Sequence, residues 1–571
     1  MNAQEALKTF FGYESFRPMQ YEIIESVLQG RDTLALLPTG GGKSLCFQIP
    51  AIVKEGLCLV ITPLIALMRD QVGQLKQRGI QAAAIYTGMS WDEQRTAMDN
   101  CRFGPYRCLY ISPERLQSEA FRKQLLTLPI CLIAVDEAHC ISQWGYDFRP
   151  AYLQIGALRQ TDAWSEVPIL ALTATATPTV ADDIQEQLHF RERNILQTSF
   201  VRPNLSYIVR YTDDKQAQIV HILNRVEGSA IVYVRNRLRC KQLSEWLNMQ
   251  LGDGVSTYYH AGLTSMERTT RQQAWTSGRT RVMVATNAFG MGIDKPDVRI
   301  VIHHDMPDSI EAYFQEAGRA GRDEKRAFAV LLYHPSDKAT VIQRIPNNFP
   351  EPEFVDRVYQ TLCNYLTIGL GSGLDHNFAL DFNQFCSDAH LAFMPTYSAL
   401  QLLTQAGYII YQDEEDVRPR TQIIVRKEEL YNLSETPFQE RLLTLMMRRY
   451  TGIFADPIYI NLSRLAEDLQ SNEFAINQSL VAMAKRRIIK YIPAHRISHV
   501  YFPLERQEDV YLKPEIYLLR KETYEHRLTA MIDYAENLQF CRSQVLLGYF
   551  GEITVSPCER CDVCLAHKKE L

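Results

Sequence analysis

The stretch LLPTGGGKS at residues 36–44 lies between the strand-like run DTLALL and an apolar helical stretch that begins at Ser44. A strand, a glycine-rich turn and a helix form the context that a phosphate-binding loop requires, because backbone N–H groups and the helix N-terminus then face the phosphates. The lysine would reach the β and γ phosphates, and the serine would hold magnesium. The strict pattern has glycine where this chain has Leu37, so a tight structural turn is the alternative. The candidate nucleotide-binding residues are Thr39, Gly40, Gly41, Gly42, Lys43 and Ser44.

Two adjacent acids end the apolar run in LIAVDEAHC at residues 132–140. The run has the pattern of a buried strand, so Asp136 and Glu137 would lie at a strand end. There Asp136 suits magnesium, and Glu137 suits orienting the water that attacks a phosphate. Acids at a strand end are otherwise solvated turn residues, but their pairing with the glycine-rich loop favours the nucleotide site.

The same alternation of strand and helix predicts the fold class. Short apolar runs alternate with longer helical patterns between residues 30 and 175, and again between 206 and 335. This is typical of parallel sheets covered by helices, so we expect two α/β lobes joined by FVRPNLSY at 200–207. The expected strands are DTLALL, GLCLVIT, RCLYIS, LIAVD and PILALTA in the first lobe, and SAIVYV, VSTYYH, RVMVAT, VRIVIHH and FAVLLY in the second.

The second lobe contains QEAGRAGRD, which places Gln315, Arg319 and Arg322 on one short basic stretch. Guanidinium groups delivered across a cleft can stabilise the charge that develops on a transferred phosphoryl group. The alternative is a surface helix with ordinary salt bridges, and the nucleotide site in the first lobe favours the catalytic role. Contact of these arginines with nucleotide would make closure of the two lobes depend on nucleotide state.

Four cysteines lie close together near the C-terminus, with the spacing C-x16-C-x2-C-x2-C. Overlapping C-x2-C steps bring thiolates to one point, and a fourth ligand from the preceding helix would complete a closed, structural zinc site. An iron–sulfur cluster and unliganded thiols are the alternatives. The other cysteines are scattered among apolar strands and are interpreted as packing residues. The candidate ligands are Cys541, Cys558, Cys561 and Cys564.

After Pro335 the regular alternation of strands and helices ends, and the pattern predicts helices with short strands. Two stretches, at 397–431 and 462–504, each combine helices with a β ribbon, which is the order of a winged helix. The basic clusters Arg448–Arg449 and Lys485–Arg487 are candidate DNA surfaces, and solvated faces are the alternative.

The composition is that of a folded, multidomain protein. The chain has 571 residues, 46% of them hydrophobic and 22% charged, so several cores are expected. It has no apolar run that could cross a bilayer and no pattern of a secretory signal, which predicts no membrane partner and a cytoplasmic location, at the nucleoid in a bacterium. The net charge of −5 argues against a dedicated nucleic-acid-binding protein, although a motor can confine positive charge to one groove.

The order of these motifs resembles that of superfamily 2 helicases, and of RecQ DNA helicases in particular. PTGGGKS, DEAH, LTATA at 172–176, ATNAFGMGID at 285–294 and QEAGRAGRD carry the resemblance, together with YFGEITVSPCERCDVC at the zinc module. It implies two RecA-like lobes and ATP, Mg²⁺ and Zn²⁺ as cofactors.

The resemblance also implies roles for further residues. FGYESFRPMQ at 11–20 is similar to the family's adenine-reading motif, and CISQWGYDFRPAY at 140–152 resembles its aromatic-rich loop, which senses single-stranded DNA. A buried aromatic cluster is the alternative for that loop. The resemblance implies that Tyr13 stacks on the adenine base, which Arg17 and Gln20 contact, and that Trp144, Phe148 and Arg149 sense single-stranded DNA. It also implies that Thr173 and Thr175 help to connect ATP hydrolysis to motion, and that Gly292 and Asp294 belong to a motif that faces both ATP and DNA.

The chain departs from the family's usual order, because a long segment separates the second lobe from the zinc module. We therefore expect domains at 1–205 (first lobe), 206–340 (second lobe), 341–525 (a winged-helix-like insert of one or two units) and 526–571 (zinc module). The expected function is ATP-dependent unwinding of forked or duplex DNA by a monomer that moves on single-stranded DNA, 3′ to 5′ by resemblance, in recombination and repair. The rivals are an RNA helicase and a DNA-binding remodelling factor that uses ATP as a clamp signal.

Overall fold

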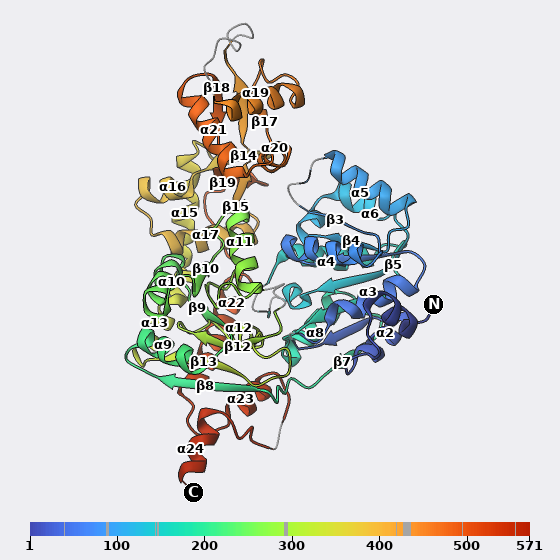
Figure 1. Ribbon diagram of the computed structural model, residues 1–571, viewed down its shortest axis with the longest axis vertical. Helices are drawn as coiled ribbons and strands as arrows, with labels where there is room; N and C mark the ends of the chain where they lie inside the picture. Colours follow the sequence, from blue (N-terminus) through green and yellow to red (C-terminus); the bar gives the residue numbers. More distant parts are fainter. Residues whose placement is uncertain are drawn as a thin grey trace. The chain divides into compact units, whose positions relative to one another are not determined.

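The computed structural model divides into two compact units, residues 1–345 with 520–571 and residues 346–519. Figure 1 labels most of their elements. The domain boundaries expected at 205, 340 and 525 remain predictions. The structure describes the whole chain except Thr39, 87–88, Ser90, Gln143, 146–147, 291–294, Arg418, 426–435, Ala494, 554–555 and Leu571.

The first lobe of the larger unit is a parallel sheet in the order β3-β4-β2-β5-β6-β1-β7, flanked by helices (Figure 1). Its strands are β1 (Thr33–Leu36), β2 (Leu57–Ile61), β3 (Ala82–Ile85), β4 (Cys108–Ile111), β5 (Ile130–Asp136), β6 (Ile169–Thr173) and β7 (Ile195–Gln197). Its helices are α1 (Ala3–Ala6), η1 (Leu7–Phe11), α2 (Gln20–Leu28), α3 (Lys43–Val53), α4 (Ile65–Gln77), α5 (Trp91–Phe103), η2 (Pro113–Gln117), α6 (Glu119–Leu125), η3 (Ala138–Ile141), η4 (Pro150–Tyr152), α7 (Leu153–Arg159) and α8 (Pro178–Gln187).

Strand β1 shows why a continuous apolar run is needed in this sheet. Successive side chains of a strand point to opposite faces. Leu34 and Leu36 belong to the core shared with α7 and α8, whereas Ala35 and Leu37 belong to the core shared with α2, α3 and α4. Both faces are therefore covered, and the strand carries no polar alternation.

The second lobe is a parallel sheet in the order β10-β11-β9-β12-β13-β8. Residues of α9 and α10 pack on one face, and α11 and α12 contribute Trp275 and Tyr313 to the core on the other. The strands are β8 (Leu205–Tyr211), β9 (Ser229–Tyr233), β10 (Ser256–Tyr259), β11 (Val282–Ala285), β12 (Val298–His303) and β13 (Ala327–Tyr333). The helices are α9 (Lys215–Arg225), α10 (Arg237–Leu251), α11 (Ser265–Thr276), α12 (Ile310–Ala317), α13 (Ser336–Ile342) and α14 (Arg344–Asn348).

The fold class predicted for the two lobes is confirmed, and the strands that the sequence pattern missed are informative. Strand β8 begins at Leu205, inside the stretch expected to be the connector, and pairs with β13 along its whole length. Strand β3 has the sequence AAAI, in which alanine gives no strand signal, yet it pairs in parallel with β4. Its pairing with β4 outweighs its weak local propensity.

The zinc module consists of α22 (Leu518–Glu536), α23 (Arg542–Tyr549) and α24 (Asp562–Glu570). It packs on the second lobe and on the connector between the lobes. The ring of Phe550 lies 5.0 Å from that of Phe314 on α12 and 5.4 Å from that of Phe200 in the connector. Glu552 accepts hydrogen bonds from the Ser199 hydroxyl and the Phe200 N–H, at 2.5 and 2.8 Å. The module therefore fixes the connector as well as α12.

The smaller unit contains two antiparallel sheets, ordered β14-β19-β15 and β17-β16-β18. The first sheet belongs with α15, α16 and α17, and the second with α19, α20 and α21. Each set has the helices and ribbon of a winged helix. The elements are α15 (Pro352–Tyr365), β14 (His376–Leu380), α16 (Phe382–Asp388), α17 (Phe393–Gln405), β15 (Ile410–Val417), β16 (Arg420–Ile423), α19 (Pro437–Arg449), β17 (Ile458–Tyr459), α20 (Leu462–Asp468), α21 (Glu473–Lys485), β18 (Ile489–Ile492) and β19 (His495–Phe502).

The two winged helices are nested, which corrects the expected pairing of their ribbons. The sequence interpretation paired β15 with the following TQII stretch, but β15 pairs with β19 and the TQII strand β16 pairs with β18 and β17. The second winged helix is thus inserted between the two wing strands of the first. Local pattern cannot reveal this, because a ribbon's partner is chosen by packing across the whole insertion.

Across the described residues, the helices are all too short or too polar to span a bilayer.

Candidate nucleotide site and zinc centre

A cavity of about 540 Å³ lies between the two lobes and brings together most of the residues predicted at the nucleotide site. From the first lobe it is lined by residues of the glycine-rich loop, the adenine-reading motif and the end of β5. From the second lobe it is lined by Gln315, Arg319 and Arg322 of QEAGRAGRD. The predicted residues in its wall are Tyr13, Arg17, Gln20, Gly40, Gly42, Lys43, Ser44, Asp136, Glu137, Gln315, Arg319 and Arg322.

The remaining predicted nucleotide residues are placed differently. Gly41 lines the neighbouring cavity described below. Thr39, Gly292 and Asp294 lie outside the described residues.

The glycines of the loop are required by its geometry. Gly40 and Gly42 have φ of +85° and +76°, in the left-handed region that L side chains rarely adopt. A Cβ on Gly42 would also approach Nε2 of Gln20 to 2.3 Å. Helix α3 begins directly after Gly42, at Lys43, so its unpaired N–H groups face the cavity end of the loop.

Side chains of the adenine-reading motif hold this loop from the outside. Nε2 of Gln20 donates to the carbonyl oxygens of Gly42 and Gly41, at 3.1 and 3.3 Å. Arg17 donates from its Nη1 to the Gly40 carbonyl, and its backbone N–H donates to Oε1 of Gln20 at 2.9 Å. Tyr13 is 52% exposed at the cavity edge, so its ring face is open to a planar ligand.

The two acids at the end of β5 are both buried. Burial raises the pKa of Asp136 to about 6, and the Glu137 carboxylate acts in the same direction, while Lys43 opposes both. Oδ2 of Asp136 accepts from the Thr62 hydroxyl at 3.3 Å, and Oδ1 accepts from the Glu137 N–H at 3.0 Å. A divalent cation beside Asp136 would favour its ionised form, which suits the magnesium role.

Glu137 is connected to the LTATA motif through His139. Nδ1 of His139 lies 3.4 Å from Oε2 of Glu137 and 2.9 Å from Oγ1 of Thr173. Oγ1 of Thr173 in turn accepts from the Thr175 N–H at 3.3 Å. His139 therefore stands between Glu137 and Thr173, and Thr175 contacts this chain of side chains through Thr173.

We expect Asp136→Asn to make the magnesium-free protein more stable at pH 7.5. The folded-state pKa of Asp136 lies above its ordinary value, so its ionised form costs stability that appears as pH rises from about 4 through 6. The neutral amide removes a cost on the order of 3 kcal/mol. Thermal unfolding at pH 7.5 and pH 4 measures this, and the two proteins should converge at pH 4; equal stability at both pH values would contradict the burial argument.

The two arginines of QEAGRAGRD are placed differently. Arg319 is 4% exposed and donates from Nη1 to the carbonyl of Gly290. Arg322 runs alongside the glycine-rich loop, so that a Cβ on Gly40 would stand 3.3 Å from its Cγ and Cδ. Arg322 is therefore the arginine that lies against the glycine-rich loop in this structure.

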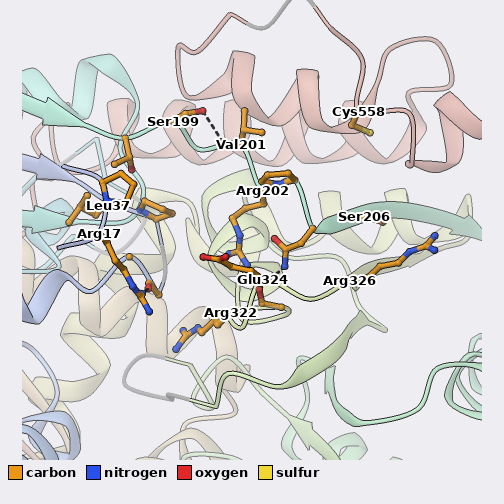
Figure 2. Close-up of a pocket in the computed structure, with 18 of the residues that line it drawn as sticks. Arg17, Leu37, Ser199, Val201, Arg202, Ser206, Arg322, Glu324, Arg326 and Cys558 are labelled. Atoms are coloured by element: carbon orange, nitrogen blue, oxygen red, sulfur yellow. Dashed lines mark hydrogen bonds between the residues drawn. The ribbon is translucent and has the colours of Figure 1, made fainter. Parts of the chain in front are cut away.

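A second, larger cavity of about 1130 Å³ adjoins the first and shares Arg17, Gly40 and Arg322 with it. Figure 2 shows Arg17 and Arg322 at one side of it and Arg326 and Cys558 at the other, with Arg202 between them. Arg202 donates to the carbonyls of Gly318, Ala320 and Gly321, so it fixes the turn that carries Arg319 and Arg322.

The three residues predicted to sense DNA lie outside both cavities. We refer to the described residues of 140–152 as the aromatic loop. Trp144 is 41% exposed, and Phe148 is partly covered by Arg520, whose Cζ lies 5.6 Å from its ring centre. The Arg149 N–H donates to the Cys140 carbonyl at 2.8 Å. An exposed indole is available for stacking, which a buried aromatic cluster would not be.

The four predicted cysteine ligands form one cluster. Their sulfur atoms all lie within 4.8 Å of one another. Thiolates around one tetrahedral zinc ion stand roughly 3.8 Å apart, given Zn–S bonds of about 2.3 Å. The N–H of Cys558 donates to Sγ of Cys541 at 3.2 Å, and that of Cys564 to Sγ of Cys561 at 3.4 Å. The residues present fit a structural zinc ion.

Family models match four parts of the chain. They are the DEAD/DEAH box helicase over residues 17–184, the helicase conserved C-terminal domain over 214–324, the RecQ helicase winged-helix domain of Bacteroidota over 421–493 and the RecQ zinc-binding domain over 507–565. Probable ATP-dependent DNA helicase RecS of Bacillus subtilis is 42% identical over 338 residues, covering 58% of this chain and 67% of that protein. The chain belongs to the RecQ family of superfamily 2 helicases.

Other comparisons agree with this family. ATP-dependent DNA helicase RecQ of Pasteurella multocida is 43% identical over 339 residues, covering 59% of this chain and 53% of that protein. The chain thus spans about half the length of the RecQ relatives that it matches. The crystal structure of the DUF1998 helicase MrfA bound to DNA matches with a TM-score of 0.50 and 17% identity, over 72% of this chain and 57% of that one, which shows the fold alone.

The winged-helix model covers the inner of the two nested winged helices, from within β16 to after β18. The winged-helix character expected of the insert is confirmed there, and so is the zinc-binding character of the C-terminal cysteines.

Several residues that shape the RecQ nucleotide cavity were missed from sequence. Gln71 on α4 donates to the Ser44 hydroxyl at 3.1 Å, Thr62 holds Asp136, and His139 connects Glu137 to Thr173. Gln71 and Thr62 carry no local motif. His139 stands in the DEAH sequence, so its position next to Glu137 was the available signal.

Removing the zinc site is expected to unfold the RecQ zinc module. Structural zinc supplies on the order of 10 kcal/mol of folding free energy to a small site, far more than this short module gains from packing. Cys561→Ser should lose the bound zinc and make residues 537–560 sensitive to protease. Zinc content and limited proteolysis measure this, with Cys131→Ser, outside the cluster, as the matched control. Zinc retained by Cys561→Ser would contradict the assignment.

Proposed function

We propose that this protein is an ATP-dependent DNA helicase that couples ATP hydrolysis to movement on single-stranded DNA and so unwinds forked or duplex DNA. The proposal rests on the nucleotide cavity, where the glycine-rich loop and Asp136 and Glu137 of one lobe meet Gln315, Arg319 and Arg322 of the other. Relatives named ATP-dependent DNA helicases support the substrate class.

In the proposed mechanism, the glycine-rich loop and Lys43 bind the phosphates. Ser44 and Asp136 would hold magnesium, which would supply positive charge at the β and γ phosphates. Glu137 orients the attacking water, and Arg322 and Arg319 stabilise the charge of the transferred phosphoryl group. Tyr13, Arg17 and Gln20 contact the base. Because the residues that contact the nucleotide come from both lobes, ATP hydrolysis changes how closely the two lobes approach each other.

The aromatic loop follows the catalytic acids directly in the chain, which supports its role as the DNA sensor. Trp144 stacks on a base of the single strand, and Phe148 and Arg149 complete the contact. By resemblance to the family, the proposal includes movement along single-stranded DNA from 3′ to 5′ and a role in recombination and repair.

The test compares ATP hydrolysis without nucleic acid, with single-stranded DNA and with RNA of the same sequence. DNA should stimulate hydrolysis well above RNA, and Trp144→Ala should lose most of the stimulation while retaining hydrolysis without DNA. Strand displacement on forks with a 3′ or a 5′ single-stranded arm tests unwinding and its direction. Equal stimulation by RNA would favour an RNA helicase, and stimulated hydrolysis without displacement would favour a clamp.

A further inference from the structure

Arg527, on helix α22 of the zinc module, holds the backbone of the aromatic loop. Its Nη1 donates to the carbonyl oxygen of Gly145 at 3.1 Å, and its Nη2 donates to that of Trp144. The side chain is 13% exposed, so these hydrogen bonds are largely shielded from water. A planar guanidinium donates in fixed directions, which lets one side chain orient two neighbouring carbonyls at once.

The same guanidinium also contacts the second lobe. Its Nε lies 3.3 Å from Oε1 of Glu311, a residue that is 4% exposed. That oxygen accepts a further hydrogen bond from the Tyr549 hydroxyl at 2.9 Å. Glu311 stands in the first turn of α12, the helix that carries Gln315 and leads into Arg319. Arg527 therefore joins the aromatic loop to the helix of the arginine motif.

The loop backbone is held on its other side as well. The Trp144 N–H donates to the Ser142 hydroxyl at 3.2 Å, and this hydroxyl donates to Asp183 at 2.5 Å. The indole takes no part in these contacts and is 41% exposed. Arg527 thus fixes where the tryptophan backbone lies and leaves its ring available.

We propose that Arg527 is a positioning residue that transmits the binding of single-stranded DNA at Trp144 to helix α12 and so to the nucleotide cavity. This inference rests on the proposed function, because it names the regulation of that same site. A base that stacks on Trp144 shifts the carbonyl groups of Trp144 and Gly145. The guanidinium of Arg527, which binds these carbonyls and Glu311, then transmits the displacement to Glu311. The zinc module is therefore part of the coupling between DNA binding and hydrolysis.

The test measures ATP hydrolysis with and without saturating single-stranded DNA. Arg527→Ala should lower the DNA-saturated rate about tenfold, as expected for losing charge-assisted hydrogen bonds, while the DNA-free rate and the KM for ATP change little. Arg527→Lys should be almost as defective, because an ammonium lacks the planar fork. His526→Ala, at an exposed neighbouring position on the same helix, is the matched control and should behave as wild type.

A double mutant separates coupling from a structural role. If Arg527 acts through the loop, Arg527→Ala with Trp144→Ala is no more defective than Trp144→Ala alone, because both changes remove one pathway. Zinc content should stay at the wild-type value, and the Arg527→Ala variant should remain folded at the assay temperature although its unfolding midpoint falls, because Glu311 loses a buried partner. Full DNA stimulation of Arg527→Ala, additive defects in the double mutant, or an equal loss of DNA-free hydrolysis would each overturn the inference. A wild-type protein that DNA does not stimulate would instead overturn the proposed function.

Discussion

Arg322→Ala is expected to lower kcat for ATP hydrolysis about a thousandfold, because an arginine that stabilises the transferred phosphoryl group contributes at least that much in related phosphoryl-transfer sites. The KM for ATP should change little, since this charge develops in the transition state and not in bound ATP. Arg322 is chosen because its side chain lies beside the glycine-rich loop. If Gly40 carried a Cβ, that atom would stand 3.3 Å from Cγ and Cδ of Arg322.

Two further variants make the test specific. Arg322→Lys keeps the charge but loses the planar fork, so it should recover only a small part of the rate. Arg326→Ala is the matched control, because Arg326 lines the second cavity and not the nucleotide cavity. Steady-state kinetics with saturating DNA measure all three. A normal kcat in Arg322→Ala, or the same loss in Arg326→Ala, would remove Arg322 from the catalytic assignment.

The parts of the fold and site that could be predicted from sequence are those written in contiguous residues. A phosphate-binding loop needs its glycines, lysine and serine within a few positions, because consecutive backbone N–H groups surround one phosphate. Likewise, β5 is an unbroken apolar run that ends in its two acids, so Asp136 and Glu137 could be placed at a strand end. Three of the four cysteines, Cys558, Cys561 and Cys564, are separated from one another by only two residues each, so that part of the cluster is written in contiguous sequence.

The parts that sequence could not give depend on contacts between distant segments. The nested winged helices require β15 to pair with β19 across an inserted domain, and β3 is held by pairing with β4 and not by its alanines. Arg527 contacts residues more than two hundred positions away in two different lobes. Nothing in its own neighbourhood distinguishes it from a surface arginine.

Glu137 shows the same contrast, because its position at a strand end can be predicted from sequence, whereas its backbone conformation and its contact with His139 cannot. Its φ of +49° places it in the left-handed region, a conformation that costs a non-glycine residue of order 1 kcal/mol or more and that clusters at functional sites. The turn aims its carboxylate at both the cavity and His139, whose Nδ1 is 3.4 Å away.

Glu137→Gln is therefore expected to lower kcat for ATP hydrolysis by about a thousandfold while ATP binding persists. The amide is the same size and leaves the backbone turn intact, but it cannot accept the proton of the attacking water, a contribution typically worth about 10²–10⁴ in rate. Single-turnover hydrolysis and nucleotide-binding measurements separate the two effects. Glu119→Gln, at an exposed surface ion pair with Lys123, is the control. If Glu137→Gln hydrolyses ATP at the wild-type rate, the water is oriented by another group, and the connection from Glu137 through His139 to Thr173 serves structure alone.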